Sequence, residues 1–174
     1  MFSQKTDAKL EEAESYFRRI VHLRTLHEGT DSKGVCDAKK IVVSCLYKLG
    51  KYLEAIPLQR DILDWHERNH NCDAQSTVDH RYSMADIQLF ARHYTNALDG
   101  LLRVVSWRKV TYGKDHIKTL MVVQRVGMAH TCLGRLGEAL PYLVEAADGY
   151  MTLEPHSAST VTALEIVAET AKKN

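Results

Sequence analysis

Hydrophobic residues recur along this chain at intervals of three and four positions, which is the spacing of one face of an α-helix. One such face comprises Tyr52, Ala55, Ile56, Ile62 and Leu63, and a second comprises Tyr94, Ala97, Leu98, Leu101, Val104 and Val105. A face with this period is typical of a helix that packs one side against a neighbour. The pattern predicts an all-α fold.

The helical pattern repeats with a period of 42 residues. Leu10, Tyr52, Tyr94 and Leu136 are 42 positions apart, as are Ala13, Ala55, Ala97 and Ala139. Pro57 and Pro141 fall in the same register, and so do Trp65 and Trp107. Self-similarity at a fixed period indicates a stacked array of small structural units, each of which contacts its neighbours.

Each unit is predicted to hold two helices. Gly50 and Gly134 stand between them, because a glycine readily takes the left-handed conformation that ends a helix. Pro57 and Pro141 lie inside second helices and should bend them slightly. We therefore expect a single domain over residues 1–174. Its predicted parts are a lone helix at 6–28, helix pairs at 35–68, 77–112 and 119–152, and a capping helix at 159–172.

The anchors resemble those of tetratricopeptide repeats (TPRs) of the 42-residue, kinesin light chain-like type. The segment Gly50-Lys51-Tyr52-Leu53-Glu54-Ala55-Ile56-Pro57-Leu58 matches the G-x-Y-x-E-A-x-P-L turn of that type, and Gly113-Lys114-Asp115-His116-Ile117-Lys118-Thr119-Leu120 matches its G-x-x-H-x-x-T-L linker. The unit at Arg92–Asn96 departs from the pattern, since it lacks the glycine and the glutamate. The resemblance implies an α-solenoid whose first helices line a concave surface for a peptide or another protein.

The resemblance also implies which residues point into that groove. The inward positions of the three first helices are Asp37, Lys40, Ser44 and Tyr47; Asp79, Tyr82, Asp86 and Leu89; and Met121, Gln124, Met128 and Thr131. Aromatic, methionine and hydrogen-bonding side chains at this spacing suit an extended peptide with apolar anchors. Asp79 and Asp86 favour a basic or amine-bearing ligand, whereas the grooves of kinesin light chains tend to be basic.

Composition narrows the class of protein further. The net charge of +1 gives no electrostatic case for a nucleic-acid partner. No apolar run is long enough for a membrane helix, and the N-terminal sequence lacks the apolar segment of a signal peptide, so we expect a cytoplasmic protein without a membrane partner. The four cysteines lie far apart, and we expect reduced, buried thiols. Arginines 18, 19 and 24 alternate with glutamates 11, 12 and 14, which predicts a solvated face.

One motif carries a chemical alternative. The segment His66-Glu67-Arg68-Asn69-His70 matches H-E-x-x-H, which on a helix can hold zinc with the glutamate as a general base. The repeat register places it at the end of a second helix, and the sequence offers no obvious third ligand. A structural metal site at His66, His70 and Cys72 is a weaker alternative. We therefore predict no catalytic residue, metal site or cofactor. We expect His130 to fill a packing position, and His116 either to cap the helix that follows it or to bond the backbone of the turn.

The sequence leaves three functions open. The leading one is a non-enzymatic protein–protein interaction scaffold, or adaptor, that binds a peptide segment in the groove. The second is an enzyme or accessory protein that binds a small molecule through Asp79, Tyr82, Asp86, Gln124 and His130. The third is a regulatory domain that forms homo-oligomers through its end helices. Fold alone does not choose among them.

Overall fold

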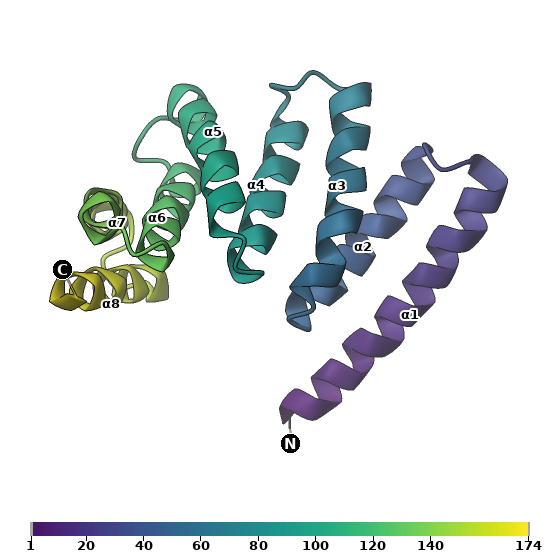
Figure 1. The fold of residues 1–174 in the computed structure, drawn as a ribbon, viewed down its shortest axis with the longest axis horizontal. Coiled ribbons are helices and arrows are strands. Elements are labelled where there is room, and N and C mark those ends of the chain that lie inside the picture. The colour runs from purple at the N-terminus through teal and green to yellow at the C-terminus, as the bar shows by residue number, and fades with distance from the viewer. Residues whose placement is uncertain (1, 174) are drawn as a thin grey trace. The chain divides into compact units, whose positions relative to one another are not determined.

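The computed structural model describes residues 2–173, with side chains from Thr6 onward, and this range folds entirely into helices and their connections (Figure 1). The helices are α1 (Phe2–Glu28), α2 (Lys33–Lys48), α3 (Tyr52–Asn69), α4 (Gln75–Phe90), α5 (Tyr94–Tyr112), α6 (Ile117–Cys132), α7 (Leu136–Leu153) and α8 (Ala158–Lys173). The predicted all-α fold of helix pairs, with a half-repeat helix at each end, is confirmed. In the described range no helix is long and apolar enough to cross a membrane.

The helices form two compact units, one of α1–α4 ending at Ala91 and the other of α5–α8 beginning at Arg92. Within each unit every helix packs against the next one along the chain. The core of the first unit is made by apolar side chains of α2, α3 and α4, namely Cys36, Val42, Val43, Leu46, Ala55, Ile62 and Ile87. Phe17 and Val21 of α1 pack against this cluster. Each core is therefore a series of contacts between neighbouring helices.

Backbone conformation at the turns follows the repeat. Gly50 and Gly134 have φ angles of 71° and 74°, so both adopt the left-handed conformation that the sequence predicts for them. Arg92 lies 42 residues after Gly50 and keeps this conformation, with φ of 65°, although it has a side chain. A side chain makes this region unfavourable, so the repeat geometry imposes backbone strain at Arg92.

Close helix contact explains the small residues of the second unit. A Cβ atom added at Gly127 of α6 would lie 2.6 Å from the Leu143 side chain of α7, and one at Gly149 of α7 would meet Leu120 of α6. Pro57 and Pro141 lie inside α3 and α7, as predicted. His116 caps α6, because its Nδ1 accepts a hydrogen bond from the Lys118 amide at 3.1 Å.

The cysteines differ in part from expectation. All four are free thiols, and Cys36 and Cys45 are buried as predicted. Cys72 and Cys132 are exposed, so the prediction of buried thiols is wrong for these two. Cys72 lies in the connection between α3 and α4, and Cys132 is the last residue of α6, and such positions lie at the surface.

Candidate functional site

The predicted groove residues of the first unit lie on α2 and α4, and we call the surface that they would form the first-helix face. A hydrogen bond joins the two helices there: the Tyr47 hydroxyl donates to Asp86 Oδ2 at 2.7 Å. Asp86 is only 8% exposed, so its carboxylate is held inside this face. The Asp86 carboxylate therefore holds the Tyr47 hydroxyl in place and is largely shielded from solvent.

An aromatic cluster continues this face. The ring of Tyr47 contacts the rings of Tyr52 and Phe90 at centroid distances of 5.5 and 5.8 Å, and Tyr52 stacks on Phe90 at 5.4 Å. Phe90 remains 38% exposed. Aromatic rings that are partly open to solvent and fixed by one another suit the binding of an apolar side chain at small entropic cost. The sequence did not predict that Phe90 of α4 and Tyr52, the first residue of α3, contact Tyr47.

The remaining groove residues of the first unit are mostly half-buried. Lys40 pairs with Asp37 at 3.1 Å, one helical turn apart on α2, and Ser44 is exposed beside them. Asp79 and Tyr82 of α4 are half-buried. Leu89 is buried among core residues, 4% exposed, and therefore contributes packing to this face more than contact surface.

The second unit carries the third set of groove residues on α6. Met121 is exposed, and Gln124, Met128 and Thr131 are half-buried. The Met128 sulfur lies 3.3 Å from Nη1 of Arg125, and the Thr131 hydroxyl donates to the Gly127 carbonyl oxygen at 3.0 Å. Their side chains offer a flexible thioether and an amide at helical spacing, which can adapt to different apolar and polar ligand groups.

Three histidines of the first unit lie together at the HERNH segment. His66 is buried. Its ring centroid lies 4.3 Å from that of His80 on α4 and 5.2 Å from that of His70. Neither ring nitrogen of His66 has a hydrogen-bond partner among the described residues. No group of three or more His, Cys, Asp or Glu side chains is arranged for a metal ion in the part of the chain that the structure describes. The HERNH residues instead end α3, with His70 just beyond the helix.

Burial and nearby cationic groups lower the pKa values of these imidazoles, and the carboxylates of Asp79 and Asp37 oppose them only in part. Burial lowers the pKa of His80 to about 4, and the neighbouring His66 and Lys40 add to this effect. The pKa of His66 is also lowered, mainly by burial and then by the charges of Lys40 and His70. The pair therefore stays neutral at pH 7.

His130 of the second unit is a packing residue, as the sequence predicts. It is buried on α6, and its ring stacks on Tyr142 of α7 with centroids 5.6 Å apart. Its Nδ1 lies 3.4 Å from a carboxylate oxygen of Glu138.

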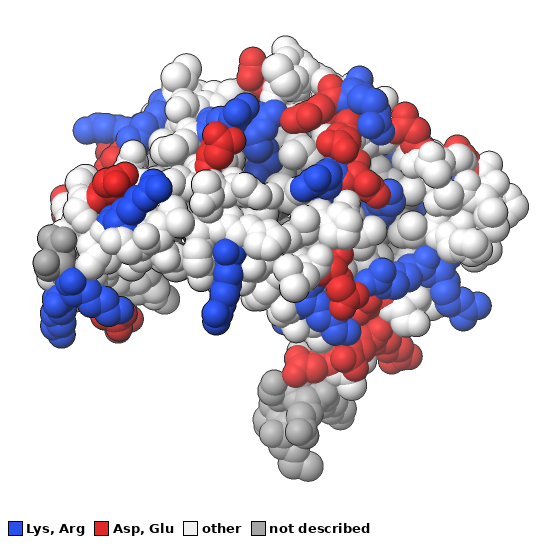
Figure 2. Space-filling model, in the orientation of Figure 1, with Lys and Arg blue, Asp and Glu red and all other residues white. Residues whose placement is uncertain are grey.

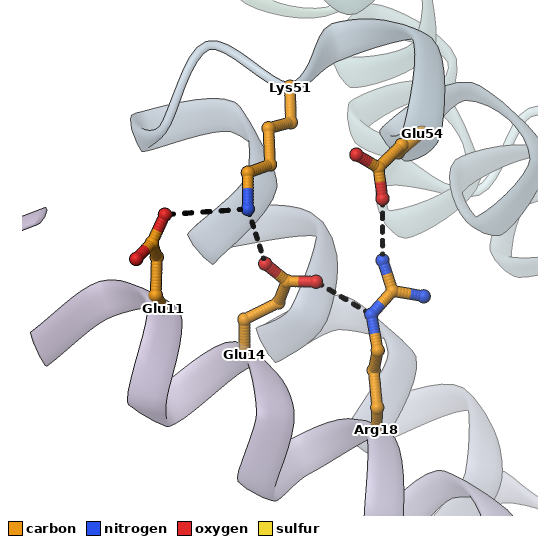
Figure 3. A network of polar contacts seen from close by, with 5 residues as sticks. All are labelled: Glu11, Glu14, Arg18, Lys51 and Glu54. Carbon is orange, nitrogen blue, oxygen red and sulfur yellow. Dashed lines mark hydrogen bonds and ion pairs between the residues drawn. The ribbon is translucent and has the colours of Figure 1, made fainter. Parts of the chain in front are cut away.

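An ion-pair network links α1 to α3 (Figure 3), and the prediction of a solvated face on α1 holds for its exposed charged residues but is wrong for Glu14. Glu14 is buried, accepts a hydrogen bond from Arg18 at 2.6 Å and pairs with Lys51 at 3.2 Å. Arg18 also reaches Glu54 at 3.1 Å, and Lys51 reaches Glu11 at 3.7 Å. Burial raises the pKa of Glu14, but the bonds and charges of Arg18 and Lys51 outweigh it and lower the pKa. Along α1, acidic side chains gather first and basic ones follow (Figure 2).

The known structures that resemble this chain share its helical repeats. A kinesin light chain-like protein with nearly identical TPR-like repeats from Podosopora anserina matches with a TM-score of 0.81, 15% identity, 97% of this chain and 80% of its own. The fold is that of TPR-like repeat proteins. BtubC from P. vanneervenii has a TM-score of 0.64, 14% identity, 96% of this chain and 65% of its own. MamA RS-1 has a TM-score of 0.52, 15% identity, 92% of this chain and 95% of its own.

At this level of identity the likeness concerns the TPR-like fold alone. No protein-family model matches the sequence, and no curated protein matches it either. The kinesin light chain-like resemblance of the sequence motifs and the structural likeness thus agree on the architecture.

Proposed function

We propose that this TPR-like chain is a protein-interaction scaffold whose first-helix faces bind an extended peptide segment of a partner protein. The observation that carries the proposal is the face formed by α2 and α4, where the Tyr47–Asp86 hydrogen bond fixes a partly exposed aromatic cluster. A fixed aromatic surface next to polar side chains suits apolar anchors of a peptide whose backbone needs hydrogen-bond partners.

The chemistry of the face indicates the kind of peptide. The carboxylates of this face are Asp37, which pairs with Lys40, Asp86, which is buried, and Asp79, which is half-buried on α4, so the face carries more acidic than basic groups. We propose a peptide with aromatic or aliphatic anchors and a basic or amine-bearing residue near Asp79. The second unit has a separate candidate face on α6, where the exposed Met121 can serve as a flexible apolar contact.

Selection from a peptide display library tests this proposal. Peptides selected on the wild-type chain that bind the first unit's face should bind the Tyr82→Ala variant at least tenfold more weakly, and peptides that bind the face on α6 should lose as much affinity for the Met128→Ala variant, as expected when a contact at the centre of an interface is truncated. Tyr16→Ala on α1 and Met151→Ala on α7 are matched controls, because both side chains are exposed and lie outside the first-helix faces. Circular dichroism and thermal unfolding confirm that each variant is folded.

Two outcomes would count against the proposal. Selected peptides that bind all four variants as tightly as the wild type would place binding elsewhere. Peptides that lose affinity only for Tyr16→Ala or Met151→Ala would assign the interaction to the second helices or to α1.

A further inference from the structure

A polar cavity of about 450 Å³ opens in the first unit at the beginning of α2 and the second half of α3. Its lining comes from the connection between α1 and α2 (Thr30, Asp31), from α2 (Val35, Cys36, Lys39) and from α3 (Asp61, Asp64, Trp65, Arg68). None of these residues belongs to the first-helix face. The volume lies within the range of pockets that take small ligands or single side chains, which is roughly 300–1,000 Å³.

Internal bonds fix the walls of this cavity. Arg68 pairs with Asp31 at 2.5 Å, and the Trp65 indole N–H donates to the Asp31 carbonyl oxygen at 2.8 Å, so the connection is fastened to α3. On the other wall Lys39 pairs with Asp61 at 2.6 Å. Walls held by such bonds need little rearrangement when a ligand enters.

One carboxylate in the cavity is left over by this pairing. Asp31 and Asp61 are each paired with a cation, whereas Asp64 is exposed and acts on Arg68 through its charge, without an ion pair of its own among the described residues. It lies on α3 between Asp61 and Arg68, one helical turn from each. The hydrogen bond to Asp31 raises the pKa of Arg68, and the charges of Asp31, Asp64 and Asp61 add to that rise. The cavity lining carries three carboxylates and two cations, so its net charge is negative.

The cavity also has an apolar part. The indole of Trp65 lines the cavity, and Val35 and Cys36, which are 1% and 3% exposed, form the buried part of the lining. A guanidinium group can pair with a carboxylate, stack on an indole and place its aliphatic stem on apolar side chains. Few other chemical groups use all three features together.

We propose that this cavity binds the guanidinium group of an arginine side chain, with Asp64 as its counter-ion and Trp65 as its stacking surface. The ligand is either a free arginine derivative or an arginine in a peptide. The site is separate from the first-helix face, so either proposal can fail without the other.

The test is a nuclear magnetic resonance titration that follows the two tryptophan indole N–H signals. Trp107 lies in the second unit and serves as the internal control, and the spectrum of Trp65→Phe assigns the signals. Nα-acetyl-arginine amide should shift the Trp65 signal in a saturable manner, and the isosteric, neutral Nα-acetyl-citrulline amide should not. A parallel titration with acetyl-Gly-Gly-Arg-Gly-Gly amide identifies the source: tighter binding of the peptide indicates a protein ligand, and equal or weaker binding indicates a free one.

Variants decide whether Asp64 is the counter-ion. Asp64→Asn should weaken binding about tenfold or more, the size expected for a charge-assisted hydrogen bond. Asp73→Asn removes the same charge from an exposed position outside the cavity and should leave binding unchanged. The proposal is overturned if the arginine derivatives produce no saturable shift of the Trp65 signal. It is also overturned if citrulline binds equally well, or if Asp64→Asn binds as the wild type does.

Discussion

Acidification should destabilise the first unit through the paired imidazoles of His66 and His80. The two rings lie 4.3 Å apart between α3 and α4, and His66 is buried without a hydrogen bond among the described residues. Other groups face them from each neighbouring helix: Lys40 and Asp37 on α2, His70 after α3 and Asp79 on α4. A proton added to either ring is thus placed beside a second imidazole and an ammonium group.

The direction and size follow from the pKa of His80. The folded value of about 4 lies below the ordinary 6.5, so the unfolded chain binds more protons between these two pH values. Stability is therefore complete above pH 6.5 and is lost as the pH falls towards 4. The lowered pKa alone corresponds to about 2 kcal/mol between pH 7 and pH 5. Because the ring is partly exposed and solvent screens its charge, we expect about 1 kcal/mol.

Urea unfolding at pH 7, 6 and 5 measures this loss, with hydrogen exchange of the α3 and α4 amides as a local readout. His80→Gln cannot take up the proton and should flatten the pH dependence. His27→Gln, at an exposed position of α1, is the matched control and should retain it. Glu14 does not interfere, because its pKa is lowered and it stays charged above pH 5. The reasoning is refuted if His80→Gln loses as much stability between pH 7 and pH 5 as the wild type.

Three further predictions concern the packing and the turns. Gly127→Ala should destabilise the second unit by about 1–3 kcal/mol, because its methyl group would meet Leu143. Gly137→Ala has open space around it and should be neutral or slightly stabilising. Thermal unfolding compares the two variants, and equal effects would contradict the close contact at Gly127. Arg92→Gly should stabilise by up to about 1 kcal/mol by relieving its positive φ, while Gly134→Ala should cost about 1 kcal/mol in the same assay; a destabilising Arg92→Gly would refute the strain. Glu14→Gln should lower the free energy of unfolding by about 1 kcal/mol in urea, because it removes a charge that pairs with Arg18 and Lys51. Glu12→Gln, at an exposed position, should lower it by less than about 0.5 kcal/mol. The reverse order would contradict a stabilising role of the network.

Most of the fold could be predicted from the repeat in the sequence. The period of 42 residues predicts where the helices and turns lie along the chain. The glycines at 50 and 134 predict a left-handed backbone conformation at their turns, because glycine adopts it readily. Arg92 shows that the array can impose the same geometry where the local residue opposes it. Local residue preference and the stacking of repeats therefore both determine the backbone conformation of a turn. Only the local preference can be predicted from the residue at a single position.

The side-chain contacts of the candidate site were harder to predict. The resemblance to tetratricopeptide repeats assigned Tyr47 and Asp86 to one groove, but it did not predict the hydrogen bond between them, because that bond joins residues 39 positions apart. The burial of Glu14 was not predicted either, because in the sequence it is one of several charged residues on one helix face. Its partner Lys51 lies in the turn before α3, far away in the sequence. The cavity beside Asp64 likewise depends on how a connection folds back onto α3.

Site-specific photocrosslinking tests the central claim, partner binding at the first-helix face, most directly. A photoreactive benzoylphenylalanine replaces Ser44, which is exposed on that face of α2, or Ser106, which is exposed on α5 outside it. The chain is irradiated in extract from its native source, and crosslinked partners are identified by mass spectrometry. The proposal predicts a defined partner peptide crosslinked from position 44 and absent from position 106. Crosslinks from position 106 alone, or no specific crosslink from position 44, would contradict it.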